Sequence, residues 1–161
     1  MPNVCNNWVR VSDCKKTIQQ LALQPLRLDM IDTPPATLEG TPYFQWVDKY
    51  WGTKWINGDP VDECEVMWVK QDDGSLVAKF ISAWAPPVAF YNRIVETYPQ
   101  LYLEYEYAEW EMGFTGYGVG GIEKTPHHFE YQSKEEMESL KTSRNWHVTI
   151  WNPHFSSSDE D

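Results

Sequence analysis

An Asp-Asp-Gly turn between two β-type runs is the feature that most constrains the fold of this chain. The turn, residues 72–74, separates Glu63–Gln71 from Ser75–Trp84, and both runs are rich in β-branched and aromatic residues. Asp-Gly readily adopts the backbone conformation of a tight hairpin turn, so the sequence predicts two adjacent antiparallel strands here. Any fold for this chain must hold that hairpin near its middle.

The elements on either side of the hairpin extend the pattern. Residues 7–12 alternate apolar and polar side chains and predict a strand, and a helix is expected from Cys14 to about Leu23. Downstream, a helix is predicted over Pro87–Tyr98 and a clearly alternating strand over Leu101–Trp110. The order β-α-β-β-α-β is typical of the split βαβ, ferredoxin-like class of α+β folds with an antiparallel sheet.

The rest of the chain is expected to decorate this unit. Residues 24–60 form an irregular, aromatic insert in which Tyr43–Lys54 is either a short helix or a pair of strands. After the core come a glycine-loosened strand over Phe114–Ile122, a helix over 133–143 capped by Ser133, and a last strand over Trp146–Trp151. We therefore expect one domain over 1–155, with an extension from 123 to 155 and a disordered acidic tail at 156–161.

The charge balance excludes several classes of protein. The chain holds 24 Asp and Glu against 13 Lys and Arg, a formal net charge of −11. This argues against direct binding of duplex nucleic acid and against a polybasic membrane-surface protein, since both need clustered cations. The sequence contains no apolar run of about 18 residues, so no membrane-spanning helix is expected. Three cysteines without paired spacing, Cys5, Cys14 and Cys64, favour a reducing cytoplasm over a disulfide framework.

The acidic residues themselves are the first candidate site. One group lies on and just after the last predicted core strand (Glu104, Glu106, Glu109, Glu111), and a second precedes the hairpin (Asp62, Glu63, Glu65). Rows of carboxylates on a folded body can occupy the basic groove of a partner protein. The sequence therefore predicts an acidic surface that binds a protein with a basic surface, while an ordinary solvated face and a homodimer both stay open.

A second candidate site lies in the aromatic insert. Lys54 stands between Trp51 and Trp55, and Trp84 follows the hairpin. A cation beside tryptophan faces can bind a small anion or a planar ring, so a nucleotide or signalling molecule is the alternative ligand. Plain cation–π packing of the lysine explains the same residues.

The sequence supports a catalytic or metal site less well than the two binding sites. Glu104 and Glu106 share one face of a strand, as the two carboxylates of a hydrolase can. An ordinary solvated strand face shows the same pattern, so the pair is weak evidence for catalysis. The histidines, His127, His128, His147 and His154, lack metal-ligand spacing. The glycines of residues 113–121 end in no P-loop lysine and favour a closely packed strand. No catalytic residue, metal or cofactor is predicted, and stacking of RNA bases on Trp84, Tyr105 and Tyr107 is opposed by the nearby acids.

Several strings together resemble a known family. They are Met1-Pro2-Asn3 with Cys5 and Asn7, then Trp51-Gly52-Thr53-Lys54-Trp55, Phe80 with Ala83-Trp84 and Pro86-Pro87, Tyr98-Pro99, Glu104-Tyr105-Glu106, and Glu111-Met112-Gly113-Phe114. Over roughly residues 1–122 the chain resembles the YubB-like proteins of phages and plasmids, which carry a ferredoxin-like domain. The resemblance implies a mobile-element origin and residence in the cytoplasm of a bacterial host, and it brings no catalytic residues. The function expected first is a non-enzymatic accessory protein that inhibits a bacterial defence or nucleic-acid-handling protein by binding it.

Overall fold

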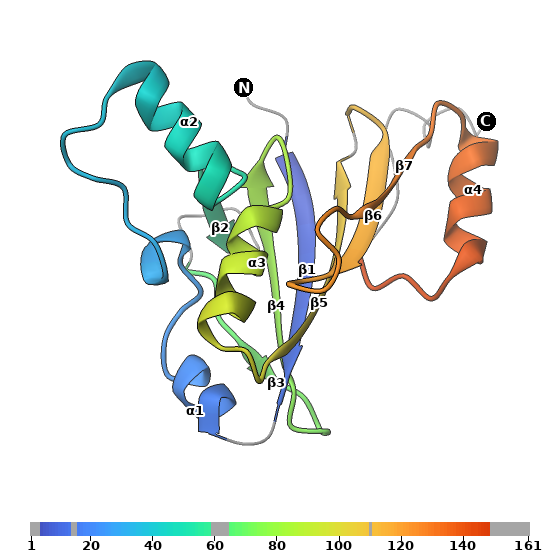
Figure 1. Ribbon diagram of the computed structural model, residues 1–161. Helices are drawn as coiled ribbons and strands as arrows, with labels where there is room; N and C mark the ends of the chain where they lie inside the picture. Colours follow the sequence, from blue (N-terminus) through green and yellow to red (C-terminus); the bar gives the residue numbers. More distant parts are fainter. Residues whose placement is uncertain (1–3, 14–15, 59–64, 110, 149–161) are drawn as a thin grey trace.

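The computed structural model describes residues 4–13, 16–58, 65–109 and 111–148, and its centre is one antiparallel sheet (Figure 1). The strands are β1 (Val4–Ser12), β2 (Ile56–Gly58), β3 (Val69–Lys70), β4 (Leu76–Ala83), β5 (Tyr102–Glu109), β6 (Phe114–Val119) and β7 (His127–Glu130). Their order is β2-β4-β1-β5-β6-β7, with β3 also pairing with β4. The four strands of the predicted unit thus lie in the order β3-β4-β1-β5, so the α+β, ferredoxin-like arrangement is confirmed.

The hairpin that anchored the prediction is present but uneven. Gly74 turns the chain with a φ of 87°, and β4 runs the expected length. The first strand, predicted to begin at Glu63, is reduced to β3, because Val66 forms a bridge with Leu26 of the insert instead of continuing along β4. This edge of the sheet is therefore formed by β3 and by two parts of the insert, β2 and the bridge at Leu26.

Three helices cover one face of the sheet, as Figure 1 shows. They are α1 (Lys16–Ala22), α2 (Gly40–Tyr50) and α3 (Val88–Thr97), with a 3₁₀ turn at Leu28–Met30 between the first two. The ambiguous stretch of the insert is thus a helix, α2. In α3 the apolar spacing predicts the burial of Tyr91 and Ile94, which is confirmed, and Phe90 is buried with them. The main core lies between these helices and β1, β4 and β5.

Strand β6 is glycine-rich because tyrosine rings fill the space beside it. A Cβ on Gly118 would collide with the hydroxyl of Tyr105 and lie 2.6 Å from its Cζ, and a Cβ on Gly116 would collide with the hydroxyl of Tyr107. The glycines therefore serve a closely packed strand, which confirms the interpretation that the sequence favours.

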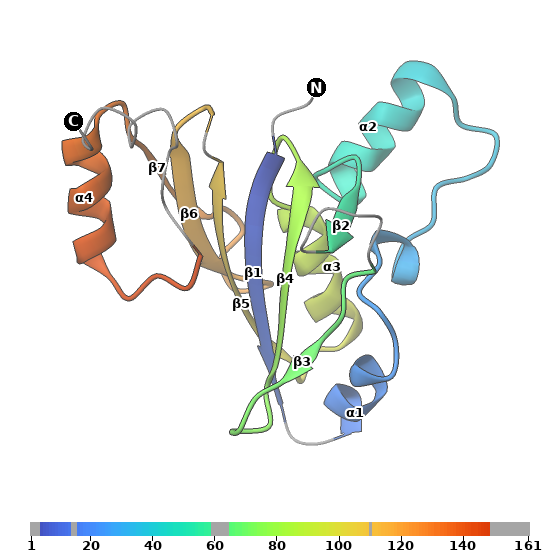
Figure 2. The same ribbon diagram turned by 180° about the vertical axis from the view of Figure 1, so that it is seen from behind.

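The opposite, outer face of the sheet is partly covered by the C-terminal part of the chain. Helix α4 (Lys134–Ser143) lies beyond β7, and Ser133 caps it by accepting the backbone N–H of Glu136 (Figures 1 and 2). The strand predicted over Trp146–Trp151 is wrong for Trp146 to Val148, which are not in a strand, and its remainder lies outside the described residues, as does the tail at 156–161. Strand β7 was not predicted.

No helix within the described ranges is long and apolar enough to cross a bilayer.

Candidate functional site

Glu106, predicted to belong to an exposed acidic row, is buried. Its side chain lies on the outer face of β5 and only 1% of the residue is exposed. One carboxylate oxygen accepts the backbone N–H groups of His147 at 2.6 Å and Val148 at 2.9 Å. The other oxygen lies 3.1 Å from a guanidinium nitrogen of Arg144. Because such charge-assisted contacts are stronger than neutral ones, Glu106 holds residues 144–148 against the sheet.

Glu109 is buried as well and serves the turn after β5. Its carboxylate accepts the backbone N–H of Glu111 at 3.1 Å and that of Met112 at 2.5 Å. The residue itself is 1% exposed, whereas Glu111 and Met112 face solvent. The carboxylate thus braces a turn whose tip presents an acid and an apolar side chain.

The remaining acids of the prediction are scattered. Glu104 is partly exposed and its carboxylate lies 2.7 Å from the guanidinium of Arg10, so its charge is balanced. Glu65 is exposed on the segment before β3, away from β5, while Asp62 and Glu63 lie outside the described residues. The predicted continuous acidic row along β5 is therefore wrong: two of its members are internal hydrogen-bond acceptors and a third is paired.

The aromatic insert, by contrast, gathers its predicted residues. Trp51, Lys54 and Trp55 line one cavity of about 400 Å³, together with Arg27 from the segment before the 3₁₀ turn. Trp51 is buried and donates its indole N–H to the backbone oxygen of Asp32 at 3.1 Å, which makes it a structural wall. The Arg27 guanidinium is engaged by its own neighbour, because both its Nε and Nη2 donate to the Asp29 carboxylate.

Lys54 also lines a second, adjoining cavity of about 380 Å³. There the ammonium nitrogen lies 5.0 Å from the centre of the Phe44 ring, and Trp84 forms another wall. Asp48 stands at the same cavity and is exposed. We call Phe44, Asp48, Lys54 and Trp84 the Lys54 site.

Trp84 reaches this cavity through a strained backbone. Its φ is 67°, the one positive value among the described non-glycine residues, and the N–H of Ala85 donates to the oxygen of Ala83 at 2.7 Å. This closes a tight three-residue turn of a kind that is rare and unfavourable for a bulky side chain. The turn is held because the Thr53 hydroxyl donates to the same Ala83 oxygen at 2.7 Å. The result is an indole that remains 49% exposed beside Lys54.

The candidates for catalysis are dispersed. Glu106 is closed off by the C-terminal segment, so it cannot form an accessible carboxylate pair with Glu104, and that version of a hydrolase is wrong. His128 makes a 2.8 Å hydrogen bond with the Tyr107 hydroxyl, and His127 pairs with Glu123. In the described ranges no three His, Cys, Asp or Glu side chains converge as metal ligands.

Cys5 and two tyrosines of β5 lie in the core. Burial raises the pKa of the Cys5 thiol far above its usual value, while Cys14, Cys64 and His154 lie outside the described residues. Tyr105 and Tyr107 are core residues, 1% exposed each, and offer no face for base stacking.

Sequence reasoning missed two residues around Lys54. Phe44 and Asp48 lie one turn apart on α2, and only the packing of that helix beside the turn at Trp84 brings them to the lysine. The aromatic density of residues 43–55 was the available signal, but it did not show which rings are buried and which line a cavity.

Comparison with known proteins identifies the domain. Residues 64–151, more than half of the chain, match a family described as "Ferredoxin-like domain in Api92-like protein". The match runs from the segment before β3 past α4, so it includes residues after 122, where the resemblance to YubB-like proteins ends. No curated protein and no solved structure matches the chain. The chain therefore belongs to the family of ferredoxin-like domains found in Api92-like proteins.

Proposed function

We propose that this protein acts by binding, and that the Lys54 site takes a small molecule with a planar ring and an anionic group, such as a nucleotide or a nucleotide-derived signal. The observation that carries the proposal is the left-handed backbone of Trp84, which holds a half-exposed indole beside a lysine that forms no ion pair with a described residue. Backbone strain of about 1–3 kcal/mol persists only where the surroundings enforce it, and it clusters at binding sites.

The chemistry of the site fits such a ligand. Trp84 and Phe44 offer ring surfaces for stacking, and Lys54 offers a cation that forms no ion pair with any described residue. Asp48 can accept a hydrogen bond from an amino or imino group of a base. The volume of about 380 Å³ falls within the usual range of small-ligand sites, roughly 300–1,000 Å³.

The test is calorimetric titration with a panel of mononucleotides and cyclic dinucleotides. We expect one member to bind, and Lys54→Gln to weaken that binding on the order of tenfold through loss of the charged contact. Lys49→Gln is the matched control, because Lys49 lies on α2 with its ammonium 5.2 Å from the Tyr50 ring and outside the cavity. The proposal would be refuted if no member of the panel gave a binding signal, or if the Lys54→Gln and Lys49→Gln variants bound the ligand with equal affinity.

A second variant separates binding from folding. Trp84→Gly removes the indole and also relieves the positive φ, so the free energy of unfolding should change by less than about 1 kcal/mol while ligand binding is lost. A large loss of stability with binding retained would instead make Trp84 a packing residue.

A second candidate function is the one that the acidic composition favours: an accessory protein of a phage or plasmid, in the cytoplasm of a bacterial host, that inhibits a defence or nucleic-acid-handling protein. Its support is the net charge of −11 and the braced turn that presents Glu111. Capture of a partner from bacterial lysate should then weaken with salt and with Glu111→Lys. Glu39→Lys, an exposed acid before α2, is the control, and capture that ignores Glu111→Lys contradicts this role.

A further inference from the structure

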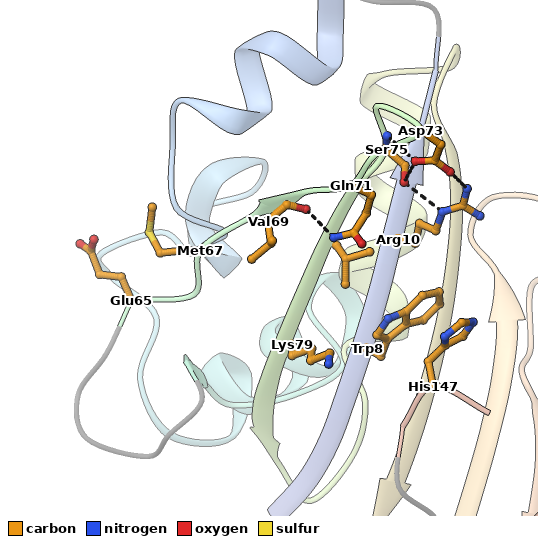
Figure 3. Close-up of a pocket in the computed structure, with 11 residues that line it drawn as sticks. Trp8, Arg10, Glu65, Met67, Val69, Gln71, Asp73, Ser75, Lys79 and His147 are labelled. Atoms are coloured by element: carbon orange, nitrogen blue, oxygen red, sulfur yellow. Dashed lines mark hydrogen bonds and ion pairs between the residues drawn. The ribbon is translucent and has the colours of Figure 1, made fainter.

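A large cavity lies on the outer face of the sheet, away from the Lys54 site (Figure 3). Its volume is about 680 Å³, and four segments build it: β1, β4, the run from Glu65 to Ser75, and the C-terminal segment at His147. Neighbouring outer side chains are fixed by strand register, since Trp8 is the cross-strand partner of Lys79 and Arg10 that of Val77. We call this space the outer-face cavity.

Among the described residues, the outer face is covered over β5 and β6 but not over β4. Over β5 and β6, Arg144 lies 3.8 Å from the centre of the Tyr117 ring, and Trp146 meets the same ring edge-on. His147 stacks on Trp8 with ring centres 4.1 Å apart, and Val148 belongs to the same buried cluster as Trp8 and Val77. Over β4 no described segment continues the cover, and the apolar side chains of Met67 and Val69 stand 53% and 60% exposed.

The polar groups at one end of the cavity are already satisfied. The Arg10 guanidinium donates to Glu104, Asp73 and Ser75, at 2.7, 2.6 and 3.1 Å. Asp73 in turn accepts the Ser75 hydroxyl at 2.6 Å. One guanidinium thus faces two carboxylates, so this end of the cavity is slightly acidic and its polar groups are engaged with one another.

Lys79 is different. It projects from the middle of β4 into the cavity and is exposed, and no ion pair or hydrogen bond joins its ammonium to a described residue (Figure 3). Among the described residues that line the cavity, Lys79 is thus the one cation without an ion pair, and the floor and one wall beside it are apolar, formed by Val77, Met67 and Val69.

We propose that the outer-face cavity binds a small amphipathic anion, with an aliphatic body along Met67, Val69 and Val77 and a single carboxylate on Lys79. An aromatic ligand would need a stacking surface, but His147 already covers Trp8, which is 6% exposed. Among the described lining residues a polyanion would meet a single cation without an ion pair, in a protein of net charge −11, and a cationic group placed at Lys79 would be repelled by its ammonium. A neutral apolar body would leave the ammonium desolvated without a partner, which is unfavourable.

The test uses the full chain with ¹³C-methyl methionine and decanoate below its micelle concentration as the probe. We expect the methyl signal of Met67 to shift on titration, while that of Met112, exposed on the distant turn after β5, stays fixed. Equal shifts of both signals would show non-specific adsorption and overturn the proposal. Contacts of the Met67 methyl with residues 149–161 in the free protein would also overturn it, because the chain would then fill its own cavity.

Charge variants test the role of Lys79. Lys79→Met should weaken decanoate binding on the order of tenfold and leave binding of uncharged decanol unchanged. Lys70→Met is the matched control, since Lys70 is an exposed lysine on β3 that does not line the cavity. Val69→Asp should weaken the binding of both decanoate and decanol, because it places a carboxylate on the apolar wall. Equal decanoate affinity in Lys79→Met and Lys70→Met overturns the proposal.

Discussion

The contact between Gly118 and Tyr105 gives the sharpest test of the packing. An alanine Cβ at position 118 would lie 2.6 Å from the Tyr105 Cζ, whereas unstrained carbon contacts are about 3.5–4.0 Å. The ring would have to move by about 1 Å, but it is stacked on Tyr91 with centres 4.8 Å apart and flanked by Tyr107. We therefore expect Gly118→Ala to cost about 2 kcal/mol of unfolding free energy, in the range of overpacked cores.

Removing the ring should reverse the sign. In the Tyr105→Leu background the methyl group has room, and alanine in a strand is favoured over glycine by about 0.5–1 kcal/mol. Urea unfolding of the four proteins of this double-mutant cycle should thus give a coupling of about 2–3 kcal/mol. At Gly116 the same cycle with Tyr107→Leu should show little rescue, because a Cβ there would also lie 2.7 Å from the backbone oxygen of His127. An equal cost of Gly118→Ala in both backgrounds would refute this reasoning.

Three further changes probe the polar contacts. Glu106→Gln should cost about 2–3 kcal/mol and raise hydrogen exchange at residues 147–148, whereas Glu104→Gln, at a partly exposed ion pair, should cost less; equal costs would contradict a clamping role. Hydrogen bonds from the Ser75 hydroxyl and backbone lower the Asp73 pKa from 3.8 to about 2, so this carboxylate stabilises the fold above pH 4 and the contribution is lost as pH falls towards 2. A carboxyl ¹³C titration should place its midpoint near 2, and Asp73→Asn should flatten the acid limb of the stability curve. Ser133→Ala should cost about 1 kcal/mol in thermal unfolding by removing the cap of α4, and no change would show that the cap is dispensable.

The sequence specifies the sheet better than it specifies the surfaces. Period-two alternation correctly assigns Tyr105 and Tyr107 to the core side of β5, and the Asp-Gly turn correctly places the hairpin. Alternation also predicts that Glu106 lies on the opposite side, which is correct. It cannot show that this side is covered, because the cover comes from residues about 40 positions later in the chain. The error in the acidic row is therefore one of tertiary burial.

The candidate site was predictable only in part for a similar reason. Local composition identifies Lys54 and Trp84, but the positive φ that exposes Trp84 arises from contacts of the turn with Thr53. Trp51 is a buried wall and Trp84 is half-exposed. This difference also depends on α2 and on the segment at Asp32, which accepts the Trp51 indole N–H. Such long-range contacts leave no mark on hydrophobic periodicity.

The distribution of cations changes what the net charge implies about a ligand. Each of the four arginines, at 10, 27, 93 and 144, pairs with a carboxylate of the described protein. Lys54 and Lys79 form no ion pair there, although acids outnumber bases by 24 to 13. In such a chain a lysine that forms no ion pair with a described carboxylate and lines a cavity offers its ammonium to an anionic ligand. Lys54 and Lys79 therefore direct the search for ligands towards small anions as well as towards basic partner proteins.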